Sequence, residues 1–173
     1  MNQLEDFLTS VNFSGLVTEA VMFSLKCEGL EDAAIIDPGC TSNVCSEGWL
    51  KTFETKMGRT FKKTMLKDLG ESRKTFVFGA GAPMEEIYRV SLDLTIFGQQ
   101  VIVQVSVVEG TQAPFLLSRQ QLSEWKAILD IEGNSIQLTI KGKTVNYLCP
   151  TTSTNLMVLP LNGVEQLDPS EGH

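Results

Sequence analysis

An aspartate, a proline and a glycine close an apolar run in the segment AAIIDPG, residues 33–39. The run before Asp37 is typical of a short strand buried on both faces. A carboxylate held at the end of a rigid strand can serve as a general base or acid. Asp37-Pro38-Gly39 is also ordinary β-turn chemistry, because proline suits the second position of a turn and glycine the third. The motif alone therefore permits either a plain turn or a catalytic loop.

The histidine and cysteine content restricts other chemistries. The single histidine is His173, the last residue, so a Ser–His or Cys–His nucleophile pair and a His-rich metal site are not expected. Cysteines stand at four positions, which are too few for a dense disulfide framework: Cys27, Cys40, Cys45 and Cys149. A zinc site around Cys40 and Cys45 is a minor alternative to small buried side chains. We expect no metal and no cofactor.

Composition favours one folded domain with short extensions. The chain has 173 residues, of which 42% are hydrophobic and 20% charged. Its net charge of −7 argues against direct nucleic-acid binding. Eight of the 14 Lys and Arg residues lie between positions 51 and 74, which favours a solvated helical face, with an acidic partner as the alternative. No apolar run of about 18 residues and no basic leader appears, so we expect no membrane segment and no secretory signal. The low cysteine content favours a reducing setting, so we expect an intracellular, cytoplasmic protein.

Residue patterns predict a mainly β fold with one or two short helices. Alternating apolar residues or continuous β-branched and apolar runs mark the strands. These strands are expected at 17–27, 33–36, 76–78, 87–96, 101–110 and 115–117, with a turn at 97–99 and a further hairpin around 132–134. A polar tail should follow Leu161.

Apolar residues three and four positions apart predict the helices. The spacing gives one helix over residues 49–57 and a second helical piece over 61–69. Ser118 should open another helix, because Gln121 stands three residues later in a capping-box pattern. Two tryptophans are expected in the core, on the inner faces of helices: Trp49 and Trp125. Three acidic residues are expected to face outward from strands, without a chemical role: Glu85, Glu86 and Asp93.

The order of these features resembles the retropepsin-like aspartic proteases, and most closely those of copia-like retrotransposon polyproteins. The first motif of that family is an apolar strand that enters Asp-Thr/Ser-Gly, and it stands here as Ile35-Ile36-Asp37-Pro38-Gly39. Further residues match the segment that follows in many retrotransposon relatives: Cys40, Val44, Cys45 and Trp49. The second motif, an apolar strand that enters Gly-Arg, stands as Leu116-Leu117-Ser118-Arg119. The glycine-rich flap corresponds to residues 78–83, with Gly79, Ala80 and Gly81 for substrate binding.

The resemblance implies a closed β-barrel or sandwich with a flap hairpin over residues 16–148, between an N-terminal extension, 1–15, and a C-terminal tail, 149–173. It implies an aspartic endopeptidase that processes a retroelement polyprotein. The family needs two such aspartates and obtains them by homodimerisation, so Asp37 from each of two copies would form the pair. Two carboxyl groups a few ångströms apart share a proton, so that one acts as base and the other as acid. The implied partners are a second copy and a peptide or polyprotein substrate.

Three positions depart from the family pattern. Pro38 stands where relatives have a Thr or Ser whose hydroxyl bonds to the partner's loop, and proline has neither that hydroxyl nor an N–H. Thr41 stands where viral enzymes have an acidic residue that pairs with the Arg of the second motif, here Arg119. Ser118 replaces glycine. The alternative function is therefore a catalytically impaired module for binding or dimerisation.

Overall fold

The computed structural model describes residues 30–70, 73–77, 82–110 and 113–162. Several predicted features lie outside these ranges: the strand at 17–27, the extension 1–15, most of the polar tail, and the flap residues Gly79, Ala80 and Gly81.

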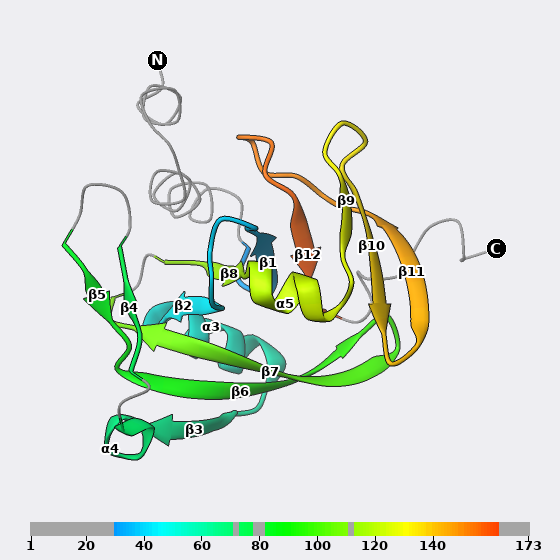
Figure 1. Ribbon diagram of the computed structural model, residues 1–173. Helices are drawn as coiled ribbons and strands as arrows, with labels where there is room; N and C mark the ends of the chain where they lie inside the picture. Colours follow the sequence, from blue (N-terminus) through cyan, green and yellow to red (C-terminus); the bar gives the residue numbers. More distant parts are fainter. Residues whose placement is uncertain (1–29, 71–72, 78–81, 111–112, 163–173) are drawn as a thin grey trace.

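A seven-stranded sheet forms the body of the molecule, in the order β12-β1-β8-β2-β7-β6-β3. Its long strands β6 and β7 curve below β1, β8 and helix α5 (Arg119–Glu124) in Figure 1, and β3 lies below them. The members are β1 (Ala33–Ile36), β2 (Val44–Ser46), β3 (Lys62–Met65), β6 (Tyr88–Ile96), β7 (Gln99–Val108), β8 (Phe115–Leu117) and β12 (Val158–Pro160). Strands β12 and β3 form its two edges. The predicted mainly β fold is confirmed, and the expected barrel takes the form of this curled sheet.

The β6–β7 hairpin is the largest pairing in the sheet, with a register from Tyr88↔Val107 to Ile96↔Gln99. Its turn falls at Phe97 and Gly98, which have φ angles of 49° and 81°. The predicted turn at 97–99 is confirmed. Every second residue of β6 is buried, as expected for a strand with one packed face.

Two smaller sheets complete the β structure. The first has the order β11-β10-β9, made of β9 (Ile128–Asp130), β10 (Ser135–Ile140) and β11 (Lys143–Leu148). Its β9–β10 hairpin confirms the one predicted around 132–134, and a further turn at Lys141 and Gly142 leads into β11. The second sheet pairs β4 (Thr75–Phe76) with β5 (Met84–Glu85) in antiparallel fashion. These two strands flank the segment where the flap was expected.

Helix α3 (Glu47–Met57) confirms the helix predicted over 49–57. Its N-cap is Ser46, whose hydroxyl accepts a hydrogen bond from Trp49 N at 3.1 Å. Gly58 ends the helix in the left-handed conformation, with φ of 71°. The Trp49 ring stacks on Phe53, with centroids 4.8 Å apart, and both side chains are buried. The predicted core position of Trp49 is thus confirmed, and Trp125 is also buried.

The prediction of a second helical piece over 61–69 is wrong in its first half. Residues Lys62–Met65 form strand β3, which pairs with β6 in antiparallel fashion, and the helical part is limited to α4 (Leu66–Leu69). Pairing with the open side of β6 satisfies the backbone of this segment, and this tertiary contact outweighs the local apolar spacing. The basic residues between 51 and 74 therefore do not lie on one helical face: α3, β3 and α4 share most of them.

The C-terminal part of the described chain belongs to the sheet. Strand β12 pairs with β1 from Ala33↔Pro160 to Ile35↔Val158, so the sheet includes residues beyond position 148. The cysteines in the described part of the chain are free and buried: Cys40, Cys45 and Cys149. Within the same residues, no three metal-ligating side chains come together. None of the described helices is long and apolar enough to cross a membrane.

Candidate active site

Strands β1 and β8 bring the two sequence motifs together. They pair in parallel, with Ile36 opposite Leu117. Asp37 N donates a hydrogen bond to Leu117 O at 3.0 Å. Beyond the strands, Arg119 N donates to Cys40 O at 2.8 Å. Segments about 80 positions apart in the sequence therefore form one unit, in which the second motif holds the loop of the first.

The Asp37 loop is a β-turn. Cys40 N donates to Asp37 O at 3.0 Å, which closes the four-residue turn, and Gly39 N donates to Asp37 Oδ1 at the same distance. Pro38 and Gly39 at the tip are exposed, whereas Asp37 and Cys40 are buried. Gly39 does not have a positive φ, so the turn does not require glycine for its backbone conformation. The two alternatives left by the sequence are compatible, because the turn itself holds the carboxylate.

The Asp37 carboxyl group is short of hydrogen-bond partners. Asp37 is only 6% exposed, and its Oδ2 atom is buried with no hydrogen-bond partner among the described residues. Burial raises the pKa of Asp37, and the hydrogen bonds from the Gly39 and Cys40 amides offset part of this effect. A buried polar atom without a partner costs free energy, and a catalytic role is one of the explanations for such an atom in a native structure. A carboxyl group that keeps its proton to a higher pH than usual suits acid–base chemistry.

Ser118 caps helix α5 (Arg119–Glu124), as predicted. Its hydroxyl accepts from Gln121 N at 3.1 Å. The reciprocal half of the predicted capping box differs, because Ser118 N donates to Asn43 Oδ1 at 2.8 Å instead. The Arg119 side chain is exposed, and none of the described acidic groups forms an ion pair with it.

Asn43 was not singled out from the sequence, yet it joins the three segments of the site. It is 7% exposed, and its Nδ2 donates to Gln104 O at 3.0 Å and to Gln121 Oε1 at 3.2 Å. Together with the bond from Ser118 N, these contacts tie the Asp37 loop to β7 and α5. The sequence gives no local signal for this role, because all the hydrogen-bond partners of the Asn43 side chain are distant in sequence.

The Ser118 cap permits a direct test of local stability. Ser118→Ala should lower the free energy of unfolding by about 1 kcal/mol, because the amide of Gln121 loses its acceptor. Ser118→Gly, which restores the residue of the family motif, should cost only a few tenths of a kcal/mol. Urea denaturation gives both values. The exposed Ser123 in the same helix provides the matched control, Ser123→Ala, and an equal loss there would contradict the role of the cap.

Glu86 corrects a prediction, since it does not face outward. It is fully buried, with an exposed fraction of 0%. Its Oε1 accepts from the Arg89 guanidinium at 2.8 Å and from Lys74 N at 3.2 Å, and its Oε2 accepts from Arg89 Nε at 2.9 Å. Asp93, by contrast, is exposed as predicted, and so is Glu85, which pairs with Arg73.

The environment of Glu86 favours its charged form. Burial by itself would raise the pKa of this carboxyl group, but hydrogen bonds from Arg89, Ser106 and the Lys74 amide, with the Arg89 charge, lower it overall. Glu86 N also donates to Lys74 O at 2.8 Å. One ionised carboxylate therefore anchors the base of the β4–β5 hairpin to β6 and β7.

Comparisons with known proteins give a distant likeness. No family model matches the chain, and none of the curated proteins matches it. Among solved structures, it is similar to the retroviral protease-like domain of Ddi1 from Leishmania major. The sequence identity is 15% and the TM-score 0.40, with 75% of this chain and 92% of that chain covered.

Proposed function

We propose that this chain is a retropepsin-like aspartic endopeptidase that works as a homodimer. One observation carries the proposal: a buried carboxyl group with an unpartnered oxygen lies at the end of β1, in a turn that the second motif holds in place. The exposed tip at Pro38 and Gly39 leaves this turn accessible to a second copy. The proposed substrate is an extended peptide, in a polyprotein of the retroelement kind that the sequence motifs indicate.

A second copy is needed because the described part of one copy supplies a single carboxyl group of this kind. The sequence contains another Asp-x-Gly, Asp68-Leu69-Gly70, but it belongs to α4 and the residue after it. Helix α4 follows the edge strand β3, and four strands separate β3 from β1 in the sheet. Figure 1 shows α4 far from β1. Two Asp37 turns facing each other across a two-fold axis would provide the pair.

In the proposed dimer, one Asp37 is ionised and the other holds a proton. The ionised carboxylate takes a proton from a water molecule, whose oxygen attacks the peptide carbonyl carbon, while the protonated carboxyl group donates its proton to the carbonyl oxygen. The C–N bond then breaks as the first Asp37 passes the proton that it took from water to the leaving amine. The second Asp37 takes a hydroxyl proton from the tetrahedral diol as the product carboxyl group forms, which leaves one carboxyl group protonated and one ionised, as at the start. The free Oδ2 is the atom available for proton sharing, because Oδ1 accepts from Gly39 N. Water is the nucleophile, so the mechanism uses no cofactor.

Sedimentation and peptide cleavage, measured on the same sample, test the proposal. The wild-type chain should cleave members of a peptide library at mildly acidic pH. Cleavage per copy should rise with protein concentration in the range where sedimentation shows the dimer forming. Full activity in a monomer would contradict the shared site.

Pro38 favours a second candidate, a non-catalytic binding or dimerisation module. Proline at the exposed turn tip has no hydroxyl and no N–H with which to bond a partner copy. Pro38→Thr should therefore tighten dimerisation by about 30-fold, since two hydrogen bonds of about 1 kcal/mol each form across a symmetric interface. It would also switch on cleavage if the wild type is inactive.

Sedimentation equilibrium measures this change in dimer affinity. Pro150→Thr, at an exposed position outside the turn, controls for the loss of a rigid residue. If the wild type is already a tight and active dimer and Pro38→Thr changes neither property, the chain is not a non-catalytic module.

A further inference from the structure

A polar groove of about 370 Å³ lies beside the Asp37 turn. Ser42 and Asn43, in the loop that follows the turn, form one wall. Lys74 lies at the base of the β4–β5 hairpin, and Glu124 lies on helix α5. Ile102 is the apolar residue among those that line the groove, so its ligand must be recognised through hydrogen bonds and charge.

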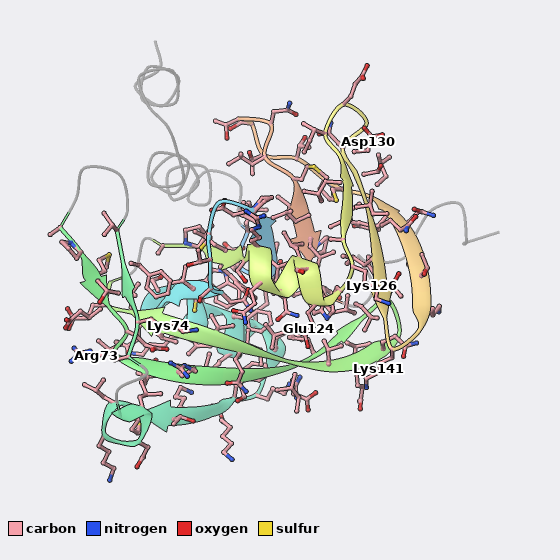
Figure 2. All side chains as sticks on the ribbon, in the orientation of Figure 1. Arg73, Lys74, Glu124, Lys126, Asp130 and Lys141 are labelled. Carbon is pink, nitrogen blue, oxygen red and sulfur yellow. The ribbon has the colours of Figure 1, made fainter. Side chains whose placement is uncertain are left out.

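Two charges in the groove have no ionic partner among the residues that the structure describes. Arg89 also lines it, but Glu86 neutralises the Arg89 charge from behind. Lys74 Nζ donates to Ser42 Oγ at 3.1 Å, and none of the acidic groups in the described ranges forms an ion pair with it. Glu124 Oε2 accepts from Gln121 Nε2 at 3.0 Å and likewise has no cationic partner there. Figure 2 shows Lys74 beside the hairpin and Glu124 below α5, well apart from each other.

Lys74 is held in place before any ligand arrives. Its backbone N–H and C=O are both bonded to Glu86, at 3.2 Å and 2.8 Å. Its ammonium group donates to Ser42 Oγ and has two further N–H donors. A cation fixed in this way loses little conformational entropy when it binds an anion.

We propose that this groove selects peptides that place an acidic side chain against Lys74 and a basic side chain against Glu124. The inference rests on the proposed function for the placement of a peptide beside the Asp37 turn. An apolar peptide would remove water from both charges without supplying hydrogen bonds in its place, so the groove should bind apolar peptides poorly. A purely acidic peptide would meet Glu124 and the overall charge of −7, so a peptide of mixed charge fits best.

Peptide binding to the Asp37→Asn chain tests the groove separately from catalysis. Fluorescence anisotropy would compare peptides of one length that carry Glu and Lys at scanned positions with peptides that carry Gln at those positions. The best mixed-charge peptide should bind about tenfold more tightly than its Gln counterpart, as expected for a charge-assisted contact. Lys74→Gln and Glu124→Gln should each remove the preference for one of the two charges.

A double reversal makes the test directional. In the Lys74→Glu, Glu124→Lys chain, the preferred positions of Glu and Lys in the peptide should exchange. Lys67→Glu, at an exposed lysine of α4, is the matched control and should leave the preference unchanged. Thermal melts of all variants report whether they are folded.

The outcomes separate this inference from the proposed function. Charge-selective binding that follows the reversal, with no cleavage by the wild type, would support the groove and reject the endopeptidase. Cleavage with no charge preference, or with a preference that the Lys74 and Glu124 variants leave unchanged, would reject the groove and retain the endopeptidase. Failure of every peptide to bind would also reject the groove.

Discussion

Asp37→Asn is expected to lower the rate of peptide cleavage by about 10²–10⁴-fold, the usual contribution of a general acid or base. The asparagine keeps the shape of the side chain and an oxygen that can accept from Gly39 N, so the turn should persist. It cannot take or give the proton that the mechanism requires. Kinetics on the best library peptide measure the loss, with circular dichroism to confirm the fold. Cleavage that survives the substitution would reject the proposed mechanism.

The same substitution should stabilise the fold at neutral pH. Burial raises the pKa of Asp37 above its ordinary value of 3.8, so the native state favours the protonated form. The contribution of Asp37 to the stability of the wild type is then fully present below pH 3.8 and is lost as the pH rises through the raised native pKa. The asparagine side chain stays neutral at every pH, so the variant should gain relative stability at pH 7 and show no such gain below pH 3.8.

Urea denaturation at the two pH values measures this difference. Asp93→Asn, on an exposed position of β6, controls for the removal of one negative charge. An Asp37→Asn chain that is less stable than the wild type at pH 7 would contradict a desolvated carboxyl group at this position.

Arg89→Met is expected to lower the free energy of unfolding by about 3–5 kcal/mol at neutral pH, because it leaves the Glu86 carboxylate buried without its cation. Glu86→Gln should cost less, since the amide can still accept from Lys74 N and the Arg89 side chain, 21% exposed, can reach water. The double change Glu86→Gln, Arg89→Met should cost less than the sum of the single changes, because no unpaired charge remains.

The matched control for this pair is Arg73→Met. Arg73 pairs with Glu85 at the surface, where the side chains are 40% and 56% exposed, so the loss should stay below about 1 kcal/mol. The contribution of Glu86 to stability has a pH dependence of the opposite sign to that of Asp37. The pKa of Glu86 is lowered, so its contribution is present above its ordinary value of 4.5 and is lost as the pH falls through the lowered native pKa. Equal losses for Arg89→Met and Arg73→Met would show that the buried pair has no special role.

Local patterns in the sequence were enough for the elements whose stability depends on near neighbours. The apolar run before Asp37 became β1, the spacing of Trp49, Leu50 and Phe53 became α3, and Ser118 became an N-cap. These features follow from residue volume, period and capping, which act within a few positions. The order of the two motifs also indicated that Asp37 and Leu117 belong to one site, and their backbones are in fact bonded.

Only the tertiary structure decided the features that depend on distant neighbours. Lys62–Met65 forms a strand because its backbone pairs with β6, although the apolar spacing of this segment suited a helix. Glu86 became buried because Arg89 and the Lys74 amide satisfy its carboxylate. Asn43 joined the Asp37 loop to α5 through Ser118 N.

The sequence by itself thus determined the chemical groups of the candidate site and the strands that carry them. It could not determine which polar groups would lose their water, because burial is a property of the packed chain as a whole. The Asp37 motif specifies a carboxyl group at the end of a strand. Its raised pKa and its unpartnered oxygen arise only once β1, β8 and the turn have packed together.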